Sequence, residues 1–224
     1  MDISPADAAS DRVWAVLLAA GSASRMGHRP KCLLERDGQP LVVRLIRQLE
    51  QAGVAGVVLV LGHYAQRIGA AVDAMAPLPD LTLCRVLNPD ADSAQDASLR
   101  LGLQSLPADA GTVLVLLADQ PLLDAADVAA LLALWQGRAG DIGFLQPVHA
   151  GLPGHPVVLS RAVAEALQHA PPGQGGRQWQ AANAERVWRW AAPHARYSTD
   201  VDQPADVDRL RAGGVELQWP AGLR

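Results

Sequence analysis

The sequence predicts an α/β protein in which helices cover both faces of a mostly parallel central sheet. Short apolar runs of strand length alternate with segments whose apolar residues recur at helical spacing, a pattern typical of three-layer αβα folds. The chain has 224 residues, of which 50% are hydrophobic. That is enough material for one domain with a large core.

The first half of the chain alternates strand and helix four times. Its strands are almost wholly apolar, as parallel strands covered on both faces are; we expect them at residues 13–18, 57–61, 81–87 and 113–117. The helices between and after them are expected at residues 41–51, 64–75, 95–105 and 123–136. Asp124 is placed to cap the last of these. The pair Asp37-Gly38 predicts a tight turn before the first helix.

The second half continues with shorter elements. Residues 142–147 and 154–159 are strand candidates, and Ser160 can cap a helix that runs to His169. The remaining elements are a proline- and glycine-rich loop at 171–176, an alternating strand at 187–190 and a final helix at 205–211. We expect Trp179, Trp188 and Trp190 to form one aromatic cluster in the core or at an interface.

Composition limits the partners and the compartment. The formal net charge is -4, which argues against nucleic acid or an anionic membrane surface as a partner. Cys32 and Cys84 lack metal-ligand spacing, and no apolar run approaches the roughly 20 residues of a membrane span. We expect a cytoplasmic protein with a frayed N-terminus at residues 1–12, one domain at 13–212 and a tail at 213–224.

A small-residue loop with two cations follows the first predicted strand. Glycine lets backbone N–H groups approach a ligand closely, and the cations can neutralise phosphate charge. We predict that this loop binds a nucleotide through Leu18, Ala19, Ala20, Gly21, Ser22, Arg25 and Lys31. The alternative is a plain strand-to-helix turn, because the spacing matches neither G-x-G-x-x-G nor G-x-x-x-x-G-K-[ST].

Asp119 ends the very apolar strand 113–117 and precedes Gln120-Pro121. Ligands of open α/β sheets bind beyond the carboxyl ends of the strands. Mg²⁺ takes oxygen ligands and keeps waters and substrate phosphates, so one or two carboxylates suffice. We predict Asp119 as a catalytic Mg²⁺ ligand, with a turn-forming role as the alternative.

Polar side chains also follow the strand at 81–87. Ser93, Gln95 and Ser98 can hydrogen-bond a base or ribose near a helix N-terminus. The alternative for this segment is a simple helix cap formed by Asp92 or Ser93. We predict Ser98 as part of the nucleotide site.

Several of these segments resemble one known family. The loop at 18–31 resembles the signature L-A-A-G-x-S-x-R-M-G-x-x-K, residues 117–121 read L-A-D-Q-P, and residues 200–206 resemble D-I-D-T-P-E-D. The chain is similar over about residues 13–210 to the MobA-like nucleotidyltransferases, and most similar to their molybdenum cofactor cytidylyltransferase branch. The resemblance implies a Rossmann-like αβα sandwich of the nucleotide-diphospho-sugar transferase type.

The resemblance also implies a reaction, in which CTP and Mo-molybdopterin give molybdopterin cytosine dinucleotide and pyrophosphate. Arg25, Lys31 and Asp119 would carry the catalysis, and Asp200 would be the second metal ligand. His155, in Gly-His-Pro, and Arg177, in a loop similar to G-D-x-G-A-R, would contact the acceptor. The remaining acids of this region are Asp202, expected either at the cap of the last helix or on the metal, and Asp206, expected in solvent.

The chain departs from the family's patterns in three places, and in the first of them Gln203 and Ala205 replace Thr and Glu of D-I-D-T-P-E-D. Residues 95–97 replace most of a G-M-S-S-S-L-like element, and Gln174 stands where the loop pattern has an acid. Three alternatives therefore remain. The protein could be a guanylyltransferase with the same roles, a non-catalytic chaperone in transient contact with a molybdenum hydroxylase apoenzyme, or an NAD-dependent oxidoreductase without the usual glycine fingerprint.

Overall fold

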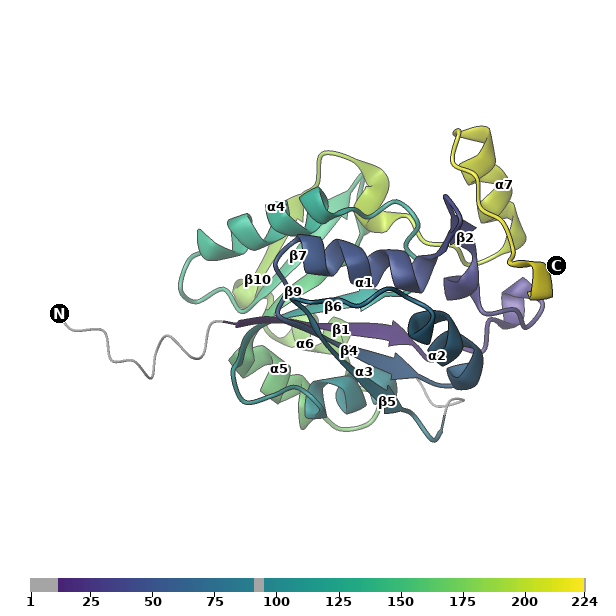
Figure 1. Ribbon diagram of the computed structural model, residues 1–224. Helices are drawn as coiled ribbons and strands as arrows, with labels where there is room; N and C mark the ends of the chain where they lie inside the picture. Colours follow the sequence, from purple (N-terminus) through teal and green to yellow (C-terminus); the bar gives the residue numbers. More distant parts are fainter. Residues whose placement is uncertain (1–11, 91–94, 224) are drawn as a thin grey trace.

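The computed structural model describes residues 12–90 and 95–223 (Figure 1). The strands are β1 (Arg12–Ala19), β2 (Glu35–Arg36), β3 (Gln39–Pro40), β4 (Gly56–Leu61), β5 (Thr82–Leu87), β6 (Ala110–Leu117), β7 (Phe144–His149), β8 (Leu152–Pro153), β9 (Val157–Ser160) and β10 (Val187–Ala191). The α-helices are α1 (Leu41–Gln51), α2 (Ala65–Asp73), α3 (Gln95–Gln104), α4 (Ala125–Gln136), α5 (Arg161–Gln168), α6 (Gly176–Ala182) and α7 (Pro204–Ala212). The expected fraying of residues 1–12 lies, apart from Arg12, outside the described residues.

The main sheet confirms the predicted α/β architecture. Its strand order is β10-β7-β9-β6-β1-β4-β5, with β8 paired to β7 at one margin. Strands β6, β1, β4 and β5 pair in parallel, whereas β9 runs antiparallel to both β6 and β7. The carboxyl ends of β1, β4 and β6 therefore meet at one edge of the sheet, where ligands of such folds bind.

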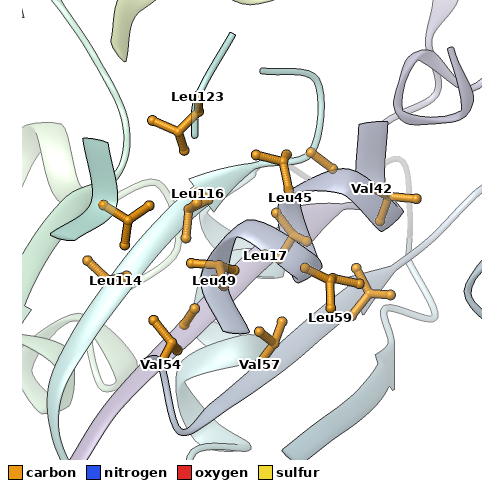
Figure 2. Packing of buried hydrophobic residues seen from close by; sticks show 14 of the residues in the cluster. Leu17, Val42, Leu45, Leu49, Val54, Val57, Leu59, Leu114, Leu116 and Leu123 are labelled. Carbon is orange, nitrogen blue, oxygen red and sulfur yellow. The ribbon is translucent and has the colours of Figure 1, made fainter. Parts of the chain in front are cut away.

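Successive residues of the central strands enter two separate cores. In β1, Ala15 and Leu17 pack toward α1, α2 and α4, whereas Trp14 and Val16 pack toward α3 and α5. Figure 2 shows the first core, where Leu45 and Leu49 of α1 lie over Leu17 and its neighbours. Burial on both faces explains why these strands are continuously apolar.

A third, smaller core joins the loop at residues 18–31, called the signature loop below, to the end of the chain. Met26 and Leu34 pack with Leu210 of α7 and with Leu217. Gln218 pairs with Glu35 through two backbone hydrogen bonds of 2.7 and 2.9 Å. The segment expected to be a tail thus lies against β2, as Figure 1 also shows.

Local signals locate several turns and caps correctly. Asp37 and Gly38 both have positive φ values, 54° and 72°, and turn the β2–β3 hairpin. Asp124 and Ser160 cap α4 and α5 through hydrogen bonds of 2.9 and 3.3 Å to backbone N–H groups. The caps proposed at Asp92 or Ser93 lie outside the described residues.

Three details differ from the expectations. Strand β7 begins two residues later than predicted, and the short helix α6 follows a loop whose glycines gave no helical signal. The expected cluster of three tryptophans is wrong. Trp188 and Trp190 pack on the first core, but Trp179 packs on the second and stacks on Phe144 with ring centroids 5.9 Å apart.

No helix within residues 12–90 and 95–223 has both the length and the apolar character of a membrane span.

Candidate active site

The signature loop leaves the sheet at the carboxyl end of β1, between β4 and β6. Gly62 follows β4, and a Cβ atom at this position would lie only 2.5 Å from the carbonyl oxygen of Ala20. Glycine therefore allows the chain after β4 to pack directly under the start of the loop. Leu18, Ala19 and Ala20 are buried at this junction, and Gly21 is exposed.

The loop is shaped by two 3-10 turns and by one tyrosine. The turns span Ser24–Met26 and Lys31–Leu33. The hydroxyl of Tyr64, just before α2, lies 2.8 Å from the carbonyl oxygens of both Ser22 and His28. A hydroxyl has one proton to donate, so the two carbonyls share or alternate this bond. Tyr64, which sequence reasoning missed, ties two parts of the loop together.

Lys31 joins the loop to two carboxylates from distant parts of the chain. Its Nζ atom lies 2.6 Å from Asp119 Oδ2 and 2.6 Å from Asp202 Oδ1. Arg25 lies on the outer side, with Nη1 3.5 Å from Asp202 Oδ2. A backbone hydrogen bond of 3.1 Å from Val201 to Asp119 fixes the two acidic segments side by side.

Burial and charge set the protonation of this cluster. Burial lowers the pKa of the Lys31 ammonium, but its ion pairs with Asp119 and Asp202 outweigh that effect and hold the pKa above its ordinary value. Burial raises the pKa of Asp119, and Lys31 opposes the rise. Burial, with repulsion from Asp119 and Asp202, also raises the pKa of Asp200. The site holds more negative charge than Lys31 alone can balance.

The two carboxylate oxygens of Asp119 differ in their surroundings. Its Oδ2 accepts from Lys31, whereas its buried Oδ1 has no hydrogen-bond partner among the residues that the structure describes. A buried carboxylate oxygen without a partner is costly, and a cation beside it would remove that cost. Within residues 12–90 and 95–223, no group of three or more His, Cys, Asp or Glu side chains is arranged as a ready-made metal site. One or two carboxylates can still hold a divalent cation whose other ligands are waters or substrate phosphates.

At the start of α7, Asp202 and Asp206 differ in burial and in their partners. Asp206 is buried, and its Oδ2 accepts hydrogen bonds of 2.8 and 2.9 Å from the backbone N–H groups of Asp202 and Gln203. The expectation that Asp206 lies in solvent is wrong, because its carboxylate organises the helix start. The Asp202 carboxylate is thereby free to meet Lys31 and Arg25.

Gln120 connects the sheet edge that carries Asp119 to the loop that carries His155. Its side-chain nitrogen donates hydrogen bonds of 3.0 Å to the backbone oxygens of both His155 and Tyr197. A small cavity lies here, lined by Leu117, Gln120, Pro153, Gly154, His155, Tyr197, Ser198 and Asp200. Burial lowers the pKa of His155 to about 4, so this imidazole is neutral at pH 7.

Three other residues singled out from the sequence have clear positions. Ser98 is buried and its hydroxyl accepts a 2.9 Å hydrogen bond from the side chain of Asn88, which joins α3 to the residue that follows β5. Arg177 is exposed in the first turn of α6 and makes no ion pair with the acids above in the described part of the chain. Cys32 is buried, and burial together with Asp119 raises its pKa to about 12, so it is no nucleophile.

The parallel sheet, the loop with Lys31 and the strand-end acid define the class of nucleotidyltransferase domains. Within that class, the family model of the MobA-like NTP transferase domain matches residues 15–187. The chain belongs to this family.

Individual relatives show how far the likeness extends. Nicotine blue oxidoreductase of Paenarthrobacter nicotinovorans is 33% identical over 167 residues, which cover 73% of this chain and 78% of that protein. The bifunctional protein GlmU of Sorangium cellulosum is 34% identical over 128 residues, 57% of this chain and 27% of that protein. The chain thus spans about a quarter of the length of the GlmU relatives it matches.

Among solved structures, the crystal structure of Rv0371c from Mycobacterium tuberculosis H37Rv superposes with a TM-score of 0.70 at 26% identity. The match covers 89% of this chain and 97% of that one. Rv0371c has also been crystallised in complex with manganese, and that structure matches with a TM-score of 0.64.

Proposed function

We propose that this protein is a Mg²⁺-dependent nucleotidyltransferase that moves CMP from CTP to the terminal phosphate of molybdopterin and releases pyrophosphate. One observation carries the proposal: Lys31 of the phosphate loop lies 2.6 Å from Asp119, whose second oxygen is buried and finds no hydrogen-bond partner within residues 12–90 and 95–223. Cations for phosphates and acids for a metal thus share one site. The manganese complex of Rv0371c supports divalent metal use in the family.

Each residue has a role in this reaction. Arg25, Lys31 and the backbone N–H groups of residues 21–22 would bind the triphosphate, and Asp119 with Asp202 or Asp200 would hold the metal. The metal, when bound, neutralises charge on the α- and β-phosphates. His155 and Arg177 would contact the acceptor.

The proposed reaction does not need a strong general base. An oxygen of the acceptor phosphate attacks the α-phosphorus of CTP, the bond from that phosphorus to the bridging oxygen breaks, and pyrophosphate leaves with the electron pair. The acceptor phosphate is already ionised at neutral pH, since its second pKa is about 6. Catalysis therefore rests on positioning and charge neutralisation. His155, neutral at pH 7, is suited to hydrogen bonding rather than to ion pairing.

Pyrophosphate release tests the proposal directly. Purified protein is incubated with Mg²⁺, Mo-molybdopterin and each NTP in turn, with Asp119→Asn as the inactive control. We expect release with CTP and at least a tenfold lower rate with GTP. A preference for GTP would make the protein a guanylyltransferase. No release with any NTP from folded protein would refute the enzyme, and intact cofactor delivery to a hydroxylase apoenzyme by Asp119→Ala would favour the chaperone.

An oxidoreductase is the second candidate, because a relative of similar length carries that name. A dinucleotide site of the common kind needs a helix that begins at the glycine loop and points its N-terminus at the pyrophosphate. Here β1 is followed by two three-residue turns, and α1 begins only at Leu41. Oxidation of NADH or NADPH with nicotine blue as acceptor, at a rate above that of pyrophosphate release, would favour this candidate.

A further inference from the structure

The carboxylate of Asp96 joins two segments that are 77 residues apart in the chain. Asp96 lies in the first turn of α3, and only 14% of its side chain is exposed. Its Oδ2 atom accepts a 2.7 Å hydrogen bond from the backbone N–H of Gly173. The same oxygen lies 3.3 Å from Nη2 of Arg100, one turn later on α3.

Arg100 binds the start of the same loop, at Ala170. Its Nη1 atom donates a 2.6 Å hydrogen bond to the carbonyl oxygen of Ala170, just after α5. Its side chain is 19% exposed, which is low for an arginine. Two charged side chains on one helix thus hold both Ala170 and Gly173, and these bonds to charged groups are stronger than neutral ones.

The loop at residues 170–175 lies at the same edge of the sheet as Asp119. Helices α3, α5 and α6 cover one face of the sheet (Figure 1). Strand β9 runs antiparallel to β6, so α5 begins at the opposite edge and returns toward the edge that carries Asp119. The loop after α5 therefore reaches the start of α3, and a Cβ atom on Gly175 would lie 3.3 Å from that of Asp96.

We propose that Asp96 and Arg100 are positioning residues that lock the glycine-rich loop at 170–175 against the start of α3 and so set the place of Arg177 at the acceptor side. Asp96 and Gln174 are among the positions where the chain departs from the family-like patterns, and they belong to the two segments that the lock joins. The loop has Gln174 where the family-like pattern has an acid, and Asp96 of α3 brings a carboxylate to this loop instead. The expected effect on acceptor binding rests on the proposed function. The contacts of Asp96 and Arg100 with Gly173 and Ala170, called the lock below, do not depend on it.

Amide hydrogen exchange of the ligand-free protein tests the lock. We expect the backbone amides of Ala170 and of residues 173–176 to exchange at least about tenfold faster in Asp96→Ala, a loss of about 1.4 kcal/mol of local stability. Asp96→Asn should be intermediate, because its amide oxygen can still accept from Gly173. The matched control is Glu165→Ala, which breaks the equivalent i,i+4 ion pair with Arg161 on α5 and leaves the loop contacts intact. Equal exchange in Asp96→Ala and wild type would overturn the proposal.

Kinetics test what the lock does. With CTP and Mo-molybdopterin we expect Asp96→Ala to raise the KM for molybdopterin at least fivefold and to change the KM for CTP less than twofold. Faster loop exchange with unchanged kinetic constants would refute the acceptor-side role. Absence of pyrophosphate release from the wild type would refute the proposed function, and the exchange experiment would still decide whether the lock exists.

Discussion

Asp202 and Asp206 are four residues apart at the start of α7, yet their carboxylates have different surroundings and partners. Asp202 is 45% exposed at its side chain and faces Lys31, whereas Asp206 is buried and accepts two backbone hydrogen bonds. Burial raises the pKa of Asp206, but these bonds and Arg209 outweigh it and lower the pKa below its ordinary value. Asp202 therefore belongs to the proposed site, whereas Asp206 stabilises the start of α7.

Substitution by asparagine should separate these tasks. We expect Asp202→Asn to lower Mg²⁺-dependent pyrophosphate release by about 10- to 100-fold with little loss of stability. Asp206→Asn should lower the free energy of unfolding by about 1–3 kcal/mol, because it weakens hydrogen bonds to a charged acceptor. Rate assays and urea unfolding measure the two effects. Asp208→Asn on exposed α7 is the control for both, and full activity of Asp202→Asn would contradict the assignment.

His155 should make stability depend on pH. Burial lowers its pKa from 6.5 to about 4 in the folded protein. The unfolded chain then binds an extra proton between these values, so the free energy of unfolding falls as pH decreases through this window and is flat above it. The contribution is at most about 3 kcal/mol. Urea unfolding from pH 4 to 8 measures this effect. The free energy of unfolding should change less steeply with pH in His155→Gln than in wild type or in His169→Gln. Equal pH dependence in all three proteins would contradict the prediction.

At the scale of elements, the signature loop depends on α2 for its shape. Tyr64, at the start of that helix, is the side chain that bonds the backbone of both Ser22 and His28. We expect Tyr64→Phe to lose about 1 kcal/mol of stability, as for one hydrogen bond, and to raise the KM for CTP severalfold because the loop loosens.

Tyr197→Phe is a matched control for this prediction. It also removes a tyrosine hydrogen bond to a backbone oxygen, that of Asp127 at 3.1 Å, but one that lies under α4. It should cost similar stability and leave the KM for CTP unchanged. A KM effect of equal size in both variants would mean that loosening of the whole molecule, and not of the loop, is responsible.

The elements also show what could be predicted from the sequence. Continuous apolar runs identified the central strands, and Asp124, Ser160 and the Asp37-Gly38 pair identified caps and a turn, because each of these signals acts locally. The meeting of Lys31 with Asp119 could be expected from the rule that sites lie at strand ends. The roles of Gln120, Tyr64 and Asp96 could not be predicted, because each depends on which backbone groups from distant segments approach it.

At the scale of the molecule, three cores support the site from different sides. The two large cores hold the sheet between its helices, and the small one links the loop residue Met26 to α7 and to the end of the chain. Arg29, also in the loop, lies over the ring of Trp219 at 4.5 Å. The C-terminal segment is therefore packed behind the loop at residues 18–31.

Leu217 tests whether this packing matters for function as well as for stability. It is 3% exposed in the small core, and Leu49 of α1 is fully buried in the first core. Alanine at either position should lower the free energy of unfolding by about 2–5 kcal/mol, since each leaves a cavity. Only Leu217→Ala should also raise the KM for CTP, because only its cavity adjoins Met26 and lets the loop shift. Urea unfolding and initial rates measure both effects at a temperature where both variants are folded. Equal KM values for the two variants would show that the loop keeps its shape without the C-terminal segment.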